Sequence, residues 1–265
     1  MTLLFALVAA LGLGAGSAQG QSSRGLPKTV KAVKPSIVGI GTLYPTRQPQ
    51  AQLLGSGFVV GDGQHVMANA HVYRAAVEDE SERHGRPAED FIVAFHREGD
   101  NVSYHHVVKV SEDAEHDIVL LKLTSETLPP LTLGDDAKVE EGQSMAFTGF
   151  PIGSILGLYP ATHQAIVASI TPIVQPMPSG RALDNATISR LRETYIVFQL
   201  DAIAYPGNSG SPLYDPETGE VYGIVNSVFV KTTKERILDE PSGIAYAIPI
   251  RYAKALLEAA DVSAR

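Results

Sequence analysis

The chain has 265 residues, of which 44% are apolar and 19% charged, so it can bury a sizeable core and is not a disordered protein. Its net charge of −8 argues against nucleic acid as a general partner, because phosphate binding requires an excess of Lys and Arg. It contains no cysteine, which excludes disulfides, iron–sulfur clusters, thiolate zinc sites and a cysteine nucleophile. Its 24 glycines and 17 prolines suit a turn-rich β-protein.

Residues 1–20 carry no charged side chain, and the apolar run from Leu3 to Leu13 is followed by the small residues Gly16 and Ala18. Small residues at this spacing are typical of a signal-peptidase site, and the run is shorter than the roughly 20 residues of a membrane span. We therefore predict a signal peptide over residues 1–20 and no stable membrane insertion once it is removed. A buried N-terminal helix is the alternative. Export without cysteine points to a bacterial periplasmic or secreted protein.

After the leader, short β-branched runs are separated by Gly, Pro, Asn and Asp, a pattern typical of strands joined by turns. In the first half these runs predict strands at residues 36–44, 52–60, 65–70, 91–96, 104–111 and 117–123. In the second half they predict strands at residues 143–148, 163–174, 195–200, 211–215, 221–229 and 243–248. Residues 126–140, between the halves, are rich in Pro and acidic side chains and are predicted to be a linker.

Six strands on each side of one linker predict an all-β protein of two packed six-stranded β-barrels, over about residues 28–125 and 141–249. The segment of about residues 250–260 is predicted to be a short closing helix, because its apolar residues recur at helical spacing. Three polar segments are interpreted as surface loops, with a position beside a substrate cleft as the alternative: residues 77–90, 176–193 and 231–241.

The densest cluster of residues suited to chemistry is residues 206–212 (PGNSGSP), between two predicted strands. A serine flanked by glycines at a tight turn can expose its hydroxyl while backbone N–H groups converge on one point. The N–H groups of Gly207 and Ser209 would form an oxyanion hole for the tetrahedral intermediate of acyl transfer. Alone, the segment could equally be an ordinary Gly/Ser/Asn turn. The G-x-S-x-G elbow of an α/β-hydrolase fits less well, because Ser211 breaks it and no helical pattern follows.

A nucleophilic serine needs a base and a group that orients the base. His71 ends an apolar run (HVMANAHV), where an isolated histidine would usually be structural. Asp117 begins the apolar run DIVLLKL, an unfavourable place for a carboxylate unless a partner offsets its desolvation. A buried carboxylate that accepts a histidine N–H meets this need. The order His71, Asp117, Ser209, with the first two in one predicted barrel and the third in the other, therefore predicts a His-Asp-Ser triad.

Three motifs around these residues resemble the catalytic motifs of trypsin-like serine proteases, and the HtrA (Deg) branch most: residues 68–72 (ANAHV), 116–120 (HDIVL) and 207–212 (GNSGSP). Supporting stretches are residues 55–60 (GSGFVV), 128–131 (LPPL), 149–153 (GFPIG) and 243–249 (GIAYAIP). The resemblance runs in the family's order from about residue 28 to 255, and implies a trypsin-like protease domain within residues 21–264. It also implies polypeptide substrates and no metal or cofactor. No PDZ domain, which many relatives carry, would fit after Ala255.

The resemblance implies that Ser209 attacks the scissile carbonyl while His71 removes its proton and later protonates the leaving amine, with Asp117 holding the imidazole. Hydrolysis of the acyl-enzyme by water would follow. The expected function is that of an exported serine endopeptidase acting on unfolded or exposed polypeptide. The alternatives are a catalytically silent relative that binds polypeptide in the same cleft, and an esterase that uses the same triad.

Two departures from the family's pattern bear on activity and specificity. Ser211 stands where the family usually has glycine, and its Cβ could crowd the cleft or restrain the turn. The residues that precede the nucleophile also differ from the family's usual Ala-Ile-Asn. With part of a later strand they are predicted to shape the primary specificity pocket, which comprises Ile203, Ala204, Tyr205, Val225, Asn226 and Ser227. Because this set carries no acid, we expect an apolar or small side chain, rather than Lys or Arg, at the cleavage point.

Overall fold

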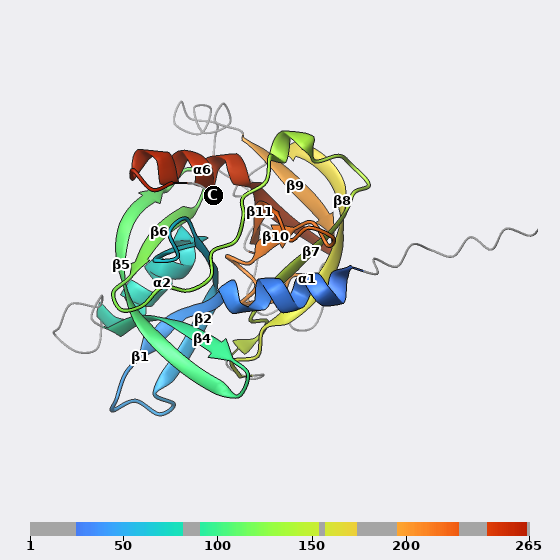
Figure 1. Cartoon of the computed structure of the whole chain (residues 1–265). Helices are drawn as coiled ribbons and strands as arrows, with labels where there is room; N and C mark the ends of the chain where they lie inside the picture. Colours follow the sequence, from blue (N-terminus) through green and yellow to red (C-terminus); the bar gives the residue numbers. More distant parts are fainter. Residues whose placement is uncertain (1–24, 82–90, 154–156, 174–194, 228–242, 264–265) are drawn as a thin grey trace, which may run out of the picture.

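Two closed antiparallel β-barrels make up most of the computed structural model, which describes residues 25–81, 91–153, 157–173, 195–227 and 243–263 (Figure 1). The N-terminal barrel consists of β1 (Ile37–Leu43), β2 (Ala51–Val60), β3 (His65–Asn69), β4 (Ile92–Glu98), β5 (Asn101–Asp113) and β6 (Ile118–Leu123). The C-terminal barrel consists of β7 (Ser144–Gly149), β8 (Ala161–Pro172), β9 (Ile196–Asp201), β10 (Pro212–Tyr214), β11 (Val221–Asn226) and β12 (Ile244–Pro249). Around the barrels the strands pair in the orders β1-β2-β3-β6-β5-β4 and β10-β11-β12-β9-β8-β7.

The strands nearest the barrel junction are buried on both faces, which explains why their sequences are continuously apolar. On β6, Val119 and Leu121 belong to the core of the N-terminal barrel. Ile118 and Leu120, which point to the opposite face, belong to an apolar cluster shared by both barrels. Alternate side chains of one strand thus contribute to the core of the barrel and to the cluster between the barrels. This arrangement packs the two barrels against each other.

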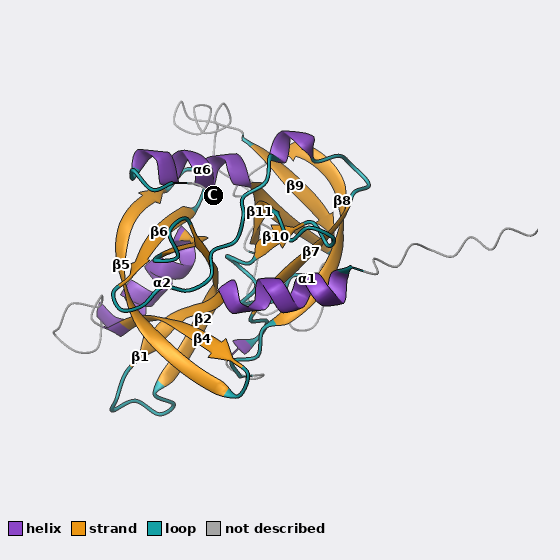
Figure 2. Cartoon of the chain, in the orientation of Figure 1, coloured by secondary structure: helices purple, strands orange, loops and turns teal. Residues whose placement is uncertain are grey.

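In the described residues, three α-helices lie around the barrels: α1 (Leu26–Val33), α2 (Ala70–Ser81) and α6 (Ile250–Ala259) (Figure 2). The closing helix α6 contacts β5 and β6 of one barrel and β11 and β12 of the other. Its residues Ile250, Ala253 and Leu257 are fully buried in the shared cluster. Among the described helices, none is long and apolar enough to cross a membrane.

The predicted fold class is confirmed, and within the described residues the predicted strand ends lie within about three residues of observed ones. The predicted strand ends at residues 174 and 229 lie outside the described residues. The helices α1 and α2 were not predicted. Residues 77–81, interpreted as the start of a surface loop, instead continue α2, because Val72, Tyr73 and Ala76 recur at helical spacing and are buried. The predicted leader and the loops at 82–90, 176–193 and 231–241 lie outside the described residues.

Candidate active site

The predicted base and the predicted orienting acid are brought together at the edge of the N-terminal barrel. His71 is the second residue of α2, immediately after β3. Asp117 closes the turn between β5 and β6 and has a left-handed backbone with φ of +56°, a conformation that aspartate tolerates better than most residues. Its carbonyl accepts hydrogen bonds from the Ala70 N–H and from the Asn69 side chain, each at 3.0 Å. These bonds tie the turn to the start of α2.

The Asp117 carboxylate accepts four N–H donors. Oδ1 accepts the backbone N–H of His71 at 2.8 Å and the Arg74 guanidinium at 3.2 Å. Oδ2 is 2.5 Å from His71 Nδ1 and accepts the Asn226 side-chain amide at 2.8 Å. Because an ionised carboxylate only accepts hydrogen bonds, Nδ1 of His71 carries the proton and Nε2 offers a lone pair. The arrangement therefore holds the imidazole in the tautomer that a general base requires.

An aromatic cluster fixes the turn that carries Asp117. The ring of His116 stacks on Tyr252 of α6 with centroids 3.8 Å apart, and Tyr195 meets it edge-on at 4.7 Å. His116 Nδ1 is also 2.7 Å from Asp113 Oδ2. Burial, followed by the negative charge of Asp117, raises the pKa of the Tyr195 phenol, so this side chain stays neutral near the carboxylate. Sequence reasoning missed Tyr195 and Tyr252, which lie far from the turn in the chain.

Ser209, the predicted nucleophile, is 3% exposed and its hydroxyl is engaged by Ser227. The two Oγ atoms are 2.5 Å apart, and the Ser227 N–H donates to Ser209 Oγ at 3.2 Å. Among the hydrogen bonds of the described residues, none joins Ser209 Oγ to His71 Nε2. Ser209 is nevertheless linked to the acid, because Ser227 follows Asn226, whose amide reaches Asp117.

The turn before Ser209 requires a glycine at position 207. Gly207 has φ of +96°, and a Cβ at this position would overlap the carbonyl of Phe150, so only glycine fits. The turn is held by hydrogen bonds from Asn208 N–H to Tyr205 at 3.0 Å and from Gly210 N–H to Val225 at 2.9 Å. In the part of the chain that the structure describes, nothing accepts the N–H groups of Gly207 and Ser209. Among the described residues, both N–H groups are therefore available for the oxyanion that the sequence predicts.

Ser211, the departure from the family's glycine, is fully buried beside Gly149 of β7. A Cβ added at Gly149 would overlap Ser211 Oγ and approach Ser56 Oγ at 2.6 Å. The extra hydroxymethyl group thus occupies the space that a glycine in β7 leaves open. The structure accommodates Ser211 through this pairing of a small residue with a larger one.

The residues assigned to the specificity pocket take two kinds of position. Ile203 is 37% exposed, and Ala204 packs against the core of the C-terminal barrel, in which Val225 is fully buried. The side chains of Asn226 and Ser227 instead bond to Asp117 and Ser209.

His163 of β8 lies near Tyr205, one of the residues assigned to the specificity pocket. Its ring stacks on Phe147 with centroids 4.9 Å apart and lies 6.3 Å from the ring of Tyr205. Its Nε2 is buried and has no partner among the described residues. Burial lowers the pKa of His163, so the imidazole is neutral at pH 7 and adds no charge to this region.

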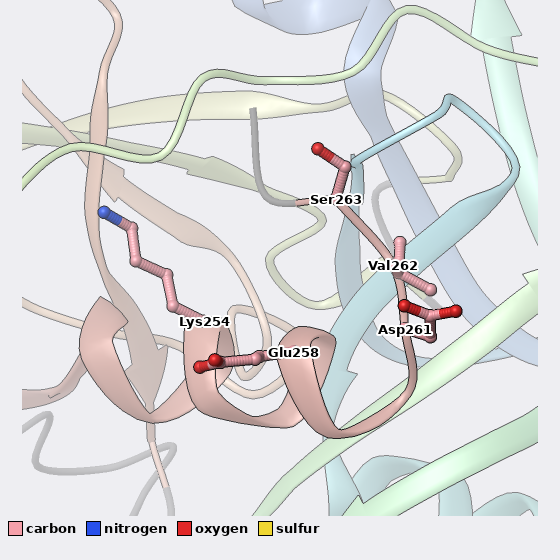
Figure 3. A pocket seen from close by; sticks show the side chains of 5 residues that line it. All are labelled: Lys254, Glu258, Asp261, Val262 and Ser263. Carbon is pink, nitrogen blue, oxygen red and sulfur yellow. The ribbon is translucent and has the colours of Figure 1, made fainter.

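A surface hollow of about 440 Å³ lies at the C-terminal end of α6, away from these residues (Figure 3). Its lining is of mixed charge and consists of Lys254, Glu258, Asp261, Val262 and Ser263. None of the predicted site residues lines it. In the described ranges, no three His, Asp or Glu side chains form a group that could hold a metal ion.

The chain is similar to known proteins in sequence and in fold. Residues 55–224 match the trypsin-like peptidase domain family. A probable periplasmic serine endoprotease, DegP-like, from Halomonas elongata is 30% identical over 198 residues, which cover 74% of this chain and 33% of the relative. Its counterpart from Pseudomonas putida is 33% identical over 205 residues, covering 77% of this chain and 34% of the relative. The chain thus spans about a third of the length of these relatives.

Among solved structures, the HtrA-type protease AlgW with a tripeptide has a TM-score of 0.61 at 23% identity, covering 88% of this chain and 62% of that one. The Rv3671c protease from M. tuberculosis, in its active form, has a TM-score of 0.59 at 22% identity, covering 89% of this chain and 85% of that one. At these identities the structures establish a shared fold. The family match over most of both barrels, together with the DegP-like relatives, shows that the chain belongs to the trypsin-like peptidase family, alongside its HtrA-type members.

Proposed function

We propose that the chain is an exported serine endopeptidase that hydrolyses peptide bonds in unfolded or exposed polypeptide through an acyl-enzyme on Ser209. The observation that carries this proposal is the chain of contacts across the barrel junction. His71 is bonded to Asp117 in one barrel, and Asn226 and Ser227 of the other barrel connect that carboxylate to Ser209. Family membership and the DegP-like relatives support the same reaction.

The proposed mechanism uses each group in the role that its contacts allow. The Ser209 hydroxyl leaves Ser227, gives its proton to His71 Nε2 and attacks the scissile carbonyl. Asp117 stabilises the imidazolium that forms, and the free N–H groups of Gly207 and Ser209 bind the developing oxyanion. His71 then protonates the leaving amine, and a water molecule activated by the same imidazole hydrolyses the acyl-enzyme. The triad needs no metal or other cofactor for these steps.

We propose that the cleavage-point side chain is apolar or small. Ile203 and Ala204 supply apolar side chains shortly before Ser209 in the chain, and the residues assigned to the pocket include no acidic side chain that would attract Lys or Arg. Cleavage of a peptide library would check this specificity. A profile dominated by basic residues at the cleavage point would contradict it.

We also propose that the protein acts in the periplasm or is secreted from a bacterial cell. The apolar, uncharged residues 1–20 and the periplasmic relatives support this location. Cell fractionation, with immunodetection of a form shortened by the leader, would test it. Retention of the full-length chain in the cytoplasm would argue against export.

A catalytically silent polypeptide-binding protein is the second candidate, favoured by the engagement of Ser209 Oγ by Ser227 rather than by His71. Labelling with a fluorophosphonate probe and casein hydrolysis, each with Ser209→Ala as control, separate the candidates. The proposed endopeptidase labels at Ser209 and cleaves casein. Absence of labelling in folded protein would indicate the silent binder, and labelling without casein cleavage would indicate an esterase.

A further inference from the structure

Both peptide groups that flank Gly207 are held by residues outside the 206–212 turn. The carbonyl of Pro206 accepts the N–H of Ile152 at 2.7 Å. The carbonyl of Gly207 accepts the hydroxyl of Ser56 at 2.6 Å, and Ser56 Oγ in turn accepts the N–H of Phe150 at 2.9 Å. The backbone N–H of Ser56 also donates to the carbonyl of Ser209 at 2.8 Å. The three residues Ser56, Phe150 and Ile152 are called the oxyanion brace below.

The bond from Ile152 to the Pro206 carbonyl determines the direction of the proposed oxyanion donor, the Gly207 N–H. The bond from Ser56 to the Gly207 carbonyl instead holds the next peptide, whose N–H belongs to Asn208. In a trans peptide the N–H points opposite to the C=O of the same plane, so fixing the Pro206 carbonyl also fixes the Gly207 N–H. Glycine with positive φ rotates more freely than any other residue, so neither peptide plane is fixed by Gly207 itself. Because an oxyanion hole works through donors that are aligned before the reaction, the alignment has to come from the neighbouring chain.

The brace has two features that a purely space-filling contact would not need. Ser56 is completely buried, and its hydroxyl both donates and accepts, so alanine would leave the Gly207 carbonyl and the Phe150 N–H without this partner. Ile152 has φ of +46°, a conformation that a β-branched residue rarely adopts. Such backbone conformations persist where the surrounding structure requires them, and here the conformation coincides with an N–H that reaches Pro206.

We propose that the backbone N–H of Ile152 aligns the Gly207 N–H, and that Ser56 is a positioning residue of the active site, which holds the Gly207–Asn208 peptide between the two oxyanion donors Gly207 and Ser209. The inference rests on the proposed peptidase function. It adds that strand β2 of the N-terminal barrel controls transition-state stabilisation in a turn that belongs to the C-terminal barrel. Substrate affinity is not expected to depend on Ser56, because its hydroxyl is buried away from solvent.

The test compares Ser56→Ala with Ser36→Ala, which removes the hydroxyl of another buried serine, 1% exposed, in the 3-10 turn that precedes β1. For Ser56→Ala we expect kcat for a peptide substrate to fall by about 10- to 100-fold, somewhat less than the loss of a whole oxyanion donor, while KM stays within about twofold. Affinity for a peptide aldehyde, which forms a tetrahedral adduct, should fall in parallel. Binding of a peptide to the Ser209→Ala background should not change. Ser36→Ala should leave all of these quantities unchanged.

Ser56→Cys, of similar volume but with a weaker hydrogen-bonding group, should give an intermediate loss of kcat and serves if the alanine variant does not fold. A folded Ser56 variant with wild-type kcat, or with raised KM and unchanged kcat, would overturn the brace. Those outcomes would leave the proposed function intact, because the wild type still turns over. A wild-type protein without turnover or labelling would instead overturn the proposed function, and the role of Ser56 with it.

Discussion

Asn226 and Arg74 both donate to the Asp117 carboxylate, but Asn226 is buried and Arg74 is exposed. Replacing each with alanine tests how burial determines the contribution of its hydrogen bond to catalysis. Asn226 is 1% exposed and donates to Oδ2 at 2.8 Å. A hydrogen bond to a charged group contributes about 1.5–3 kcal/mol. At about 1.4 kcal/mol per tenfold in rate, Asn226→Ala should lower kcat/KM by about 10- to 100-fold. The effect arises because the imidazolium of the transition state depends on a carboxylate held in one orientation.

Arg74 donates to Oδ1 of the same carboxylate at 3.2 Å, but its side chain is 46% exposed. Exposed ion pairs contribute about 0–1 kcal/mol, so Arg74→Ala should lower kcat/KM by at most about fivefold. The loss of kcat/KM caused by Arg74→Ala should disappear in about 1 M salt, because salt screens exposed charges. The loss caused by Asn226→Ala should remain at the same salt concentration. The assay is hydrolysis of one peptide amide by both variants at low and high salt, with thermal unfolding to verify that each is folded. Equal losses for the two variants, or a larger loss for Arg74→Ala, would refute the reasoning from burial.

Further predictions concern the resting nucleophile, the accommodated serine and pH. Ser227→Ala removes the hydroxyl that bonds to Ser209 Oγ and should speed fluorophosphonate labelling of Ser209 by about 2- to 10-fold, which is the net contribution of one hydrogen bond. Unchanged or slower labelling would show that this contact does not restrain the Ser209 hydroxyl. Gly149→Ala should destabilise the protein by about 1–3 kcal/mol in urea unfolding through overlap with Ser211, and adding Ser211→Gly should recover part of that loss. No recovery would mean that the two residues do not compete for space. Burial lowers the pKa of His105 below its ordinary 6.5, so the unfolded state binds more protons below pH 6.5 and stability falls as pH decreases. His105→Gln should flatten this decline in a pH series of Tm, and an unchanged slope would contradict the assignment.

The barrels were predictable because the signals that specify strands are local. Runs such as residues 117–123 combine β-branched residues with flanking turns. They are almost continuously apolar because both faces of the strand are buried. The helix α2 was not predicted, because the apolar run that forms β3 continues into Ala70, His71 and Val72 with no glycine or proline to mark the change. The helix is stabilised by the packing of Val72, Tyr73 and Ala76 against the barrel, a tertiary contact that outweighs the local strand signal.

The triad candidates were predictable from motif order, but the contacts that support them were not. Asn226 and Asp117 are 109 positions apart in the chain, and Ser56 and Gly207 are 151 apart. Such contacts depend on how β11 and β2 lie beside the two turns, and a single sequence does not encode that proximity in any local pattern. Asn226 and Ser227 were therefore assigned to the specificity pocket by position, whereas their side chains bond to Asp117 and Ser209.

The central claim, covalent catalysis by Ser209, is tested most directly by intact-mass and peptide-mapping spectrometry of protein quenched during hydrolysis of an activated peptide ester. We predict one adduct with the mass of the acyl group, located on the peptide that contains Ser209, and its absence in Ser209→Ala. His71→Ala should slow its formation by several orders of magnitude, about 10⁶-fold where the triad acts as a unit. Turnover without an adduct on Ser209, or an adduct on another residue, would contradict the claim.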